Sequence, residues 1–271
     1  MVGSFCLNSR EFYKPCCKVE QAMKFFLFSL LLIALFLPFS IALPSSKIVK
    51  ESITSNGKNR SYYPFVPEKT FLSGPQPLIL MLHGSGRNGL SLVEKWKELA
   101  SKEGIILVGP DSLNSDVWAM PADGPDFLHE LVESLRSKYP INGRRMYLFG
   151  HSAGAGFAIY MSLLESKYFA ATAIHAGALS EREYRLIDFA ERKIPIAIFV
   201  GTNDAFFPLP VVRATRDVLN GRGFSVELTE ISRHNHNYYV RASEINRLAW
   251  EFLRKHELSE EPQYKKYQHN D

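Results

Sequence analysis

The sequence of 271 residues has the composition of an ordinary globular protein, with 46% hydrophobic and 22% charged residues, which excludes a low-complexity or collagen-like chain. No internal repeat occurs at the periods that are typical of solenoids. The formal net charge of +4 is small, and lysines and arginines are scattered among acidic residues, so the sequence predicts no nucleic-acid partner.

Residues 1–42 have the pattern of an N-terminal extension followed by a secretory signal peptide. Lys24 precedes an apolar run over 25–43, and the small residues Ser40 and Ala42 suit the −3 and −1 positions of a cleavage site. This pattern predicts a secreted or periplasmic protein. If the run is not cleaved, residues 25–43 are just long enough to anchor the chain in a membrane. An association with a membrane is expected only in that case.

All three cysteines, Cys6, Cys16 and Cys17, precede the apolar run. The exported chain would therefore hold no disulfide, despite its oxidising destination. Its stability would have to come from a hydrophobic core.

Beyond the signal segment, apolar runs alternate with amphipathic ones. Strands are predicted at 61–66, 77–83, 104–110, 145–150, 170–175, 194–201 and 225–231, and helices at 90–102, 126–138, 152–164, 180–192, 209–219 and 241–256. Several strands are apolar throughout, which is typical of strands buried on both faces of a parallel sheet. We therefore expect a doubly wound α/β fold, with helices on both faces of a mostly parallel sheet and ligands bound at the carboxyl ends of the strands.

The stretch "LFGHSAGAG" matches the G-x-S-x-G motif around Ser152. A predicted strand leads into it and an alanine-rich predicted helix leads out, which is the context of a nucleophile on a sharp strand-to-helix turn. The flanking small residues suit such a turn, and the helix N-terminus favours developing negative charge. The alternative is that Ser152 only caps the helix.

A nucleophilic serine needs a base, and the base needs a third group to orient it. For this motif the acid follows the serine and the histidine comes last. Asp204 lies just beyond the sixth predicted strand, in "FVGTNDAFFP", where the acid is expected. Asp204 is also an ordinary turn former. The other downstream acids lie within predicted helices or the last strand.

Two histidines, His234 and His236, follow the last predicted strand in "ISRHNHNYYV". Either suits the base, whereas His256 and His269 lie in or beyond the final helix. The His-x-His spacing also raises a zinc site, but neither cysteine nor a tight acidic cluster accompanies it, so no metal is predicted.

Acyl transfer also needs N–H donors for the oxyanion. The N–H of Ala153 directly follows the nucleophile, and the loop "HGSGRNG" after an early strand offers the N–H of Ser85, with Gly84 as the alternative. This loop lacks the Lys-Ser/Thr pair that ends the motif of a phosphate-binding P-loop. His83 is expected to hold the loop, and His175 to pack near the site.

The loop "DSLNSDVWAMPADGPD" is expected to wall the site, with Trp118 as an apolar substrate contact. Phe206 beside the acid is a second expected contact. The alternative for Trp118 is simple packing, because an exposed indole is costly.

Four stretches, "LHGSGRNG", "INGRRMYLFGHSAGAGFA", "VGTNDAFFP" and "HNHNYY", together resemble compact α/β-hydrolase esterases, above all secreted polyhydroxybutyrate depolymerases and feruloyl-esterase-like carboxylesterases. The resemblance covers about residues 58–256. It implies that His236 is the catalytic histidine, because in several such esterases this histidine precedes a polar residue and two tyrosines. Over these residues the chain departs from such relatives in lacking cysteines, and it lacks a separate substrate-binding domain.

The expected organisation is an N-terminal segment over 1–42, an α/β-hydrolase catalytic domain over 43–258 with a minimal cap or none, and a charged mobile tail over 259–271. The expected function is a serine esterase that cleaves small-molecule or oligomeric esters through an acyl-enzyme on Ser152, Asp204 and His236, without cofactor. The alternatives are a peptidase or acyl-aminoacyl hydrolase on the same fold, and a binding protein without catalytic activity.

Overall fold

The computed structural model describes residues 48–68, 70 and 74–265, all within the unit Pro44–Asp271. The predicted signal peptide and its extension over 1–42 lie outside the described residues, as do residues 266–271 of the predicted tail. In the described ranges, every helix is too short or too polar to span a bilayer.

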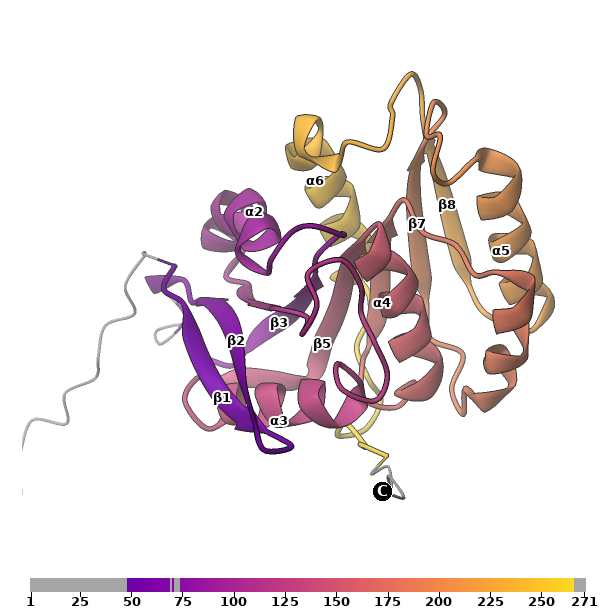
Figure 1. Cartoon of the computed structure of the whole chain (residues 1–271). Helices are drawn as coiled ribbons and strands as arrows, with labels where there is room; N and C mark the ends of the chain where they lie inside the picture. Colours follow the sequence, from indigo (N-terminus) through magenta and orange to yellow (C-terminus); the bar gives the residue numbers. More distant parts are fainter. Residues whose placement is uncertain (1–47, 69, 71–73, 266–271) are drawn as a thin grey trace, which may run out of the picture. The chain divides into compact units, whose positions relative to one another are not determined.

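Eight strands of the described residues form one sheet (Figure 1). Its order is β1-β2-β4-β3-β5-β6-β7-β8; the first two pairs are antiparallel and all pairs from β4 to β8 are parallel. This confirms the predicted α/β-hydrolase fold with a mostly parallel sheet. The strands are β1 (Glu51–Ser55), β2 (Lys58–Phe65), β3 (Gln76–Leu82), β4 (Ile106–Pro110), β5 (Ile141–His151), β6 (Ala171–His175), β7 (Ile196–Gly201) and β8 (Val226–Ile231).

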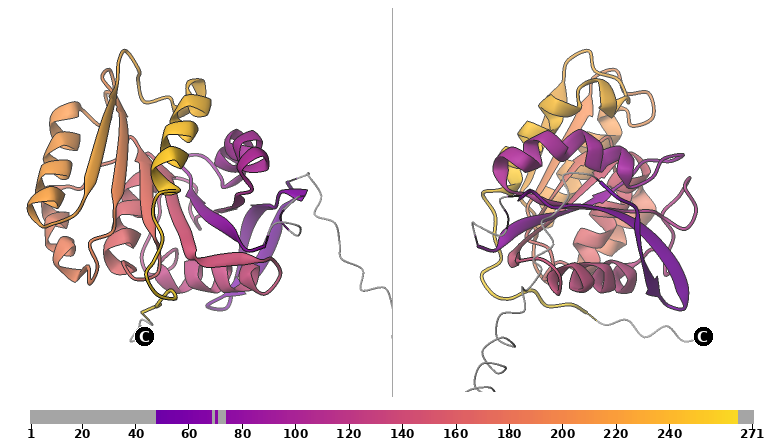
Figure 2. Two further views of the ribbon diagram at one scale, coloured as in Figure 1. Left: turned by 180° about the vertical axis from the view of Figure 1, so that it is seen from behind. Right: turned by 90° about the vertical axis from the view of Figure 1, so that its left-hand side faces the viewer.

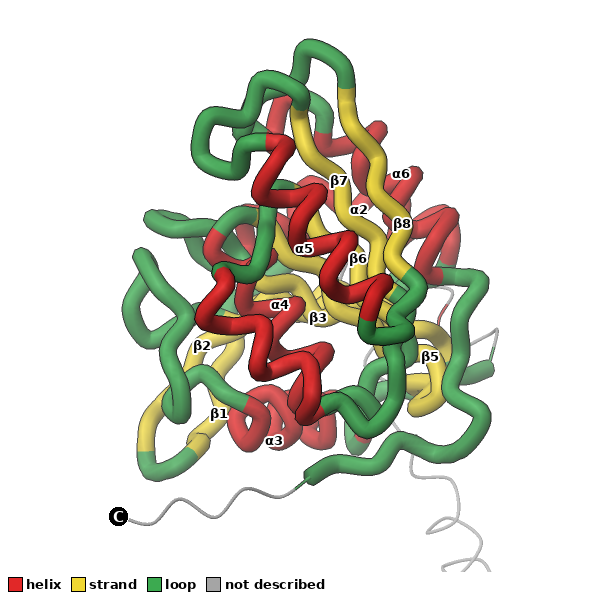
Figure 3. Tube along the Cα trace, turned by 90° about the vertical axis from the view of Figure 1, so that its right-hand side faces the viewer, coloured by secondary structure: helices red, strands yellow, loops and turns green. Residues whose placement is uncertain are grey.

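Helices cover both faces of the sheet (Figures 2 and 3). One face packs against α2 (Leu90–Glu103) and α6 (Ala242–Leu253), and the other against α3 (Pro125–Arg136), α4 (Ala153–Leu164) and α5 (Leu209–Gly221). Side chains of β3 alternate between the two cores: Leu78, Leu80 and Leu82 face α3 and α4, while Ile79 and Met81 face α2 and α6. A strand that is apolar throughout is therefore buried on both faces.

Three elements differ from the prediction. The short 3₁₀ helix η3 (Tyr238–Val240), just before α6, was not predicted. Strand β1 was not predicted, because its sequence "ESITS" is polar and it lies at the edge of the sheet. The predicted helix over 180–192 is a 3₁₀ helix, η2 (Glu181–Phe189), of which only Ile187 is fully buried. One buried side chain gives no apolar stripe to hold a regular α-helix against the sheet.

The described part of the predicted mobile tail, residues 259–265, packs against the body. Gln263 donates its backbone N–H to the Lys167 carbonyl, and the Tyr264 ring stacks on His129 with 3.8 Å between ring centroids. The tail is therefore held as far as residue 265 by aromatic stacking that its charged composition does not reveal.

The longest connection at the carboxyl ends of the parallel strands is the loop over residues 111–124, between β4 and α3. Within residues 74–265 none of these connections contains an inserted domain, which agrees with the expected minimal cap. The carboxyl ends of the strands therefore carry their loops without a further layer of secondary structure above them.

Candidate active site

A hollow of about 590 Å³ lies at the carboxyl ends of the parallel strands. Turns after β3, β5, β7 and β8 contribute its walls, which include Gly84, Ser85, His151, Ser152, Phe206 and His236. Residues that are far apart in the sequence thus meet at one edge of the sheet, where the fold predicts a ligand.

Ser152 lies on the sharp turn between β5 and α4 with a φ of 56° and a ψ of −119°. A positive φ is strained for a residue other than glycine, and it points the hydroxyl out of the strand-to-helix turn. The turn leaves no room beside it: a Cβ on Gly150 would lie 2.2 Å from the Gly154 carbonyl oxygen, and one on Gly154 would lie 2.0 Å from the Leu82 carbonyl oxygen. This explains why small residues surround the serine.

The structure brings Ser152, His236 and Asp204 together. His236 Nε2 lies 2.9 Å from Ser152 Oγ, and His236 Nδ1 lies 2.9 Å from Asp204 Oδ2. With the histidine proton on Nδ1, this nitrogen donates to the carboxylate and Nε2 accepts from the serine hydroxyl. These distances match the geometry that a serine nucleophile, a histidine base and an orienting acid require.

Asp204 is fixed by its own loop. Its side chain is fully buried, and Oδ1 accepts the backbone N–H groups of Phe206 and Phe207 at 2.9 Å each. These two bonds occupy Oδ1 and leave Oδ2 for His236. The carboxylate therefore presents a single oxygen to the imidazole in a defined direction.

The loop that carries His236 crosses the end of β7 in close contact. Asn203 donates its N–H to the His234 carbonyl at 2.8 Å, and a Cβ on Gly201 would lie 2.1 Å from that carbonyl oxygen. Only glycine allows this approach, which brings the loop after β8 over β7 toward Ser152. The backbone places His236, not His234, beside the serine.

Of the two expected oxyanion donors, Ser85 lines the hollow, and Ala153 directly follows Ser152, which also lines it. Within residues 74–265, neither the Ser85 N–H nor the Ala153 N–H donates to a protein acceptor. The loop is close to the nucleophile, since a Cβ on Gly84 would lie 3.2 Å from the Ser152 Cβ. The Ser85 hydroxyl is engaged elsewhere, because it donates to the Asp116 carbonyl at 2.7 Å.

The loop after β3 is held by His83, as expected. Its Nε2 accepts the Ser112 N–H at 3.2 Å, and its Nδ1 lies 2.9 Å from the Gly84 carbonyl oxygen, to which it donates. Burial lowers the pKa of His83, so the ring is neutral and can serve both bonds at once.

The two expected substrate contacts lie in different surroundings. Trp118 is 8% exposed, donates its indole N–H to the His83 carbonyl and stacks on Phe157, so it packs behind the loop and is not among the residues that line the hollow. Phe206 is 76% exposed and lies at the rim, with its ring centroid 4.8 Å from that of His236.

Sequence reasoning did not single out Arg87, Tyr239 and His151, which also line the hollow. The Arg87 guanidinium lies 5.0 Å from the Tyr239 ring centroid, and His151 directly precedes the nucleophile. Each lies within three residues of a predicted site residue, and Tyr239 is one of the two tyrosines in the stretch that favours His236. No group of three or more His, Cys, Asp or Glu side chains among the described residues is arranged to hold a metal ion.

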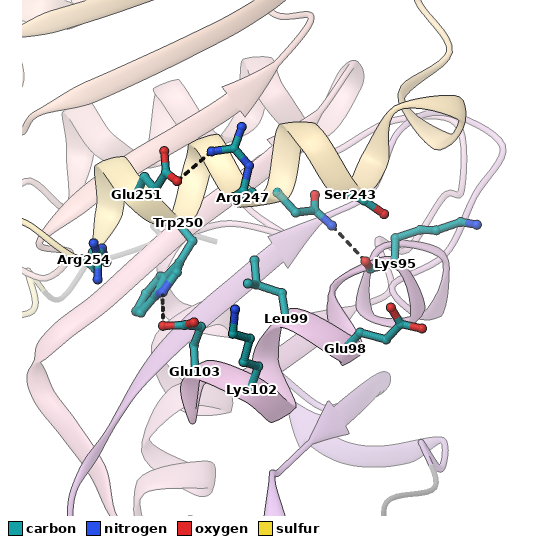
Figure 4. A pocket seen from close by; sticks show the side chains of 11 residues that line it. Lys95, Glu98, Leu99, Lys102, Glu103, Ser243, Arg247, Trp250, Glu251 and Arg254 are labelled. Carbon is teal, nitrogen blue, oxygen red and sulfur yellow. Dashed lines mark hydrogen bonds and ion pairs between the residues drawn. The ribbon is translucent and has the colours of Figure 1, made fainter.

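A second hollow, of about 410 Å³, lies between α2 and α6 (Figure 4). Trp250 donates to Glu103 and Arg247 pairs with Glu251 along its walls. Asn246 donates to the Lys95 carbonyl at 2.8 Å and joins the two helices. The residues that line this hollow include no histidine.

Comparison with known proteins identifies the family. Residues 114–265, more than half of the chain, match the dienelactone hydrolase family. The chain belongs to this family. The match begins in the loop after β4 and includes the turn of Ser152 and the loops of Asp204 and His236.

Similar proteins agree with this assignment. A bifunctional acetylxylan esterase/xylanase from Neocallimastix patriciarum is 27% identical over 163 residues, which are 58% of this chain and only 23% of that relative. Among solved structures, the fluorophosphonate-binding serine hydrolase F of Staphylococcus aureus has a TM-score of 0.67 at 14% identity, over 76% of this chain and 98% of its own. A ferulic acid esterase has a TM-score of 0.63 at 17% identity, over 77% and 98%.

At such low identity the solved structures establish the fold alone, whereas the family match identifies the chain as a hydrolase. The expected resemblance to α/β-hydrolase esterases is confirmed.

Proposed function

We propose that the chain is a serine hydrolase that cleaves carboxylic esters through an acyl-enzyme on Ser152. The observation that carries the proposal is the continuous pair of 2.9 Å contacts from Ser152 through His236 to Asp204. His236 takes the serine proton as Oγ attacks the ester carbonyl, and Asp204 stabilises the imidazolium that forms. His236 then returns the proton to the leaving alcohol, and water releases the acid by the reverse sequence.

The oxyanion of each tetrahedral intermediate would be bound by the N–H groups of Ala153 and Ser85. Both lie beside Ser152 without a protein acceptor in the described ranges, and α4 begins at Ala153, so its N-terminus adds a partial positive charge. Preorganised donors of this kind account for a large part of the rate in acyl transfer.

The substrate class proposed is small-molecule or oligomeric esters with short acyl groups. The support is an open hollow with the exposed Phe206 ring at its rim, which offers an apolar contact without enclosing a long chain.

A second proposal concerns location: residues 1–42 direct export, so N-terminal sequencing of the secreted protein would give a start near residue 43.

The proposal is tested by labelling the chain without residues 1–42 with a fluorophosphonate probe, followed by assays on p-nitrophenyl esters and matching anilides. We expect labelling and ester cleavage by the parent and by Ser137→Ala, an exposed serine at the end of α3, and neither by Ser152→Ala. His236→Ala is expected to reduce the labelling rate by about 10³-fold or more.

Faster cleavage of the anilides would favour the peptidase alternative. A folded parent that neither labels nor hydrolyses would leave only the binding protein.

A further inference from the structure

Three buried histidines form a continuous chain of hydrogen bonds beneath the hollow. His151 Nδ1 lies 3.0 Å from His175 Nδ1, and His175 Nε2 lies 3.1 Å from His234 Nε2. All three side chains are almost completely buried, and the reaction proposed above uses none of them.

The three hydrogen-bonded histidines connect the turn that carries Ser152 with the loop that carries His236. His151 is the residue before Ser152, and His234 lies two residues before His236. His175 ends β6, which pairs with β5 so that His151 and His175 are neighbours across the sheet. His175 also holds the nucleophile through its backbone, because its carbonyl accepts the Ser152 N–H at 3.1 Å.

The three rings are neutral near pH 7. Burial lowers the pKa of His151 to about 4 and that of His175 to about 2, and it also lowers the pKa of His234. The charged or titratable groups that face them are Arg87, Asp204, His236, Tyr238, Tyr239, Arg241 and Glu244, and the carboxylates do not offset the burial.

The protons of the three neutral imidazoles can be arranged in only two ways along this row of hydrogen bonds. Each ring carries one proton, so each ring can donate one bond and accept one. The protons either all point from His151 toward His234 or all point the other way. In the first order His151 is protonated on Nδ1; in the second it is protonated on Nε2.

A backbone oxygen selects the first order. His151 Nδ1 also lies 3.4 Å from the His175 carbonyl oxygen, which attracts an N–H and repels a bare nitrogen. With the proton on Nδ1, the opposite edge of the ring carries a bare Nε2. The Cδ2 of that edge lies next to Gly84, since a Cβ on Gly84 would be 3.2 Å from it, and both Gly84 and His151 line the hollow.

We propose that His175 is a positioning residue of the esterase: its imidazole fixes the order of protons from His151 to His234, which holds the Ser152 turn against the His236 loop and presents a bare Nε2 of His151 to the hollow. The positioning role rests on the proposed function, whereas the order of the protons does not. The bare nitrogen gives the hollow a hydrogen-bond acceptor beside the nucleophile.

The proton order is tested by ¹⁵N NMR of the histidine-labelled chain without residues 1–42, over pH 5 to 8. We expect His151 protonated on Nδ1 and His175 on Nε2, with neither ring titrating in this range. Protonation of His151 on Nε2, or titration of either ring near pH 6.5, overturns the proposal. Resonances are assigned by single substitutions. His256 is not one of the three hydrogen-bonded histidines, so we expect His256→Gln to leave the tautomers of His151 and His175 unchanged.

The positioning role is tested by comparing His175→Leu with His175→Gln. Leucine removes both side-chain hydrogen bonds at similar size, whereas the glutamine carboxamide carries an acceptor and a donor that can replace them. We expect kcat on p-nitrophenyl acetate to fall about tenfold to a hundredfold in His175→Leu with KM little changed, and to recover at least partly in His175→Gln.

Equal losses in two folded variants, or full activity of His175→Leu, overturn the positioning role. If His175→Leu does not fold, His175→Gln alone decides, because the role requires that it remain active. A folded parent without esterase activity refutes the proposed function and with it the positioning role, and the NMR result still decides the proton order.

Discussion

Single atoms decide the geometry around Ser152, because the turn on which it lies is packed backbone against backbone. Gly150 and Gly154 have no space for a methyl group, since the nearest atoms are main-chain oxygens that cannot move aside. Gly156, two residues further along α4, has nothing within 4 Å of an added Cβ. Gly154 and Gly156 both lie in α4, and only the first lacks space for a methyl group, so alanine substitutions at these two positions can be compared directly.

Gly154→Ala is expected to destabilise the fold by about 3 kcal/mol or more, because the new Cβ would overlap the Leu82 carbonyl oxygen. Gly156→Ala is expected to stabilise it by about 0.5–1 kcal/mol through the better helix propensity of alanine. Urea unfolding of both variants measures the difference. Equal stabilities would show that the turn relaxes more easily than its contacts indicate.

At the level of individual side chains, much of the site was predictable from the sequence. Ser152, Asp204 and His236 occupy the expected places because motif, order and strand ends fix them, and the structure brings these three side chains together. Trp118 was expected at the substrate and lies behind the loop, because a motif reveals neither the stacking on Phe157 nor the bond to His83. The chain of three histidines depends on contacts across neighbouring strands, which no local pattern contains.

Among the elements, the loop between β4 and α3 is tied to β2 by a buried ion pair. Arg60 contacts Asp123 with both side chains almost fully buried, and its guanidinium also lies over the Phe127 ring. Burial lowers the pKa of Arg60, although Asp123 opposes this. Asp123 accepts the backbone N–H groups of Leu113 and Ala119 and so gathers the loop around itself.

Asp123→Ala is expected to destabilise the protein by about 3–5 kcal/mol, because it leaves a buried guanidinium and two backbone donors without their partner. The double variant with Arg60→Met removes the stranded charge and is expected to recover part of the loss. Thermal unfolding of the parent and the three variants measures the coupling. Additive losses would contradict a direct interaction.

The parallel strands and the α-helices were predictable because apolar residues recur at the spacing of their buried faces. The elements that were missed lack such a pattern. Strand β1 is polar and held by backbone pairing with β2, and η2 buries one side chain completely. Sequence periodicity reports burial, so elements with little burial escape it.

For the molecule as a whole, buried neutral histidines make stability depend on pH. The folded-state pKa of His151 is about 4 and that of His175 about 2, both lowered by burial, against about 6.5 in an unfolded chain. Between these values the unfolded state binds more protons, so its population rises as the pH falls. The stabilisation is complete above pH 6.5 and is lost progressively below it.

We expect the free energy of unfolding to fall by roughly 2 kcal/mol per buried histidine between pH 7 and pH 5, or about 4 kcal/mol for these two. Urea unfolding at both pH values measures the change, and His175→Gln should reduce it by roughly 2 kcal/mol. A parent that is equally stable at pH 5 and pH 7 would mean that these rings are hydrated or already protonated in the folded state.

The order of the site residues along the chain has a consequence for biosynthesis. Ser152, the proposed nucleophile, follows β5, whereas His236, its proposed base, follows β8, the last strand, and reaches the serine only by crossing Gly201. A ribosome therefore exposes the turn of Ser152 long before the imidazole that activates it has been translated. Under the proposed mechanism the serine is an ordinary alcohol during that interval, and the nascent protein would not attack esters until its final strand has docked.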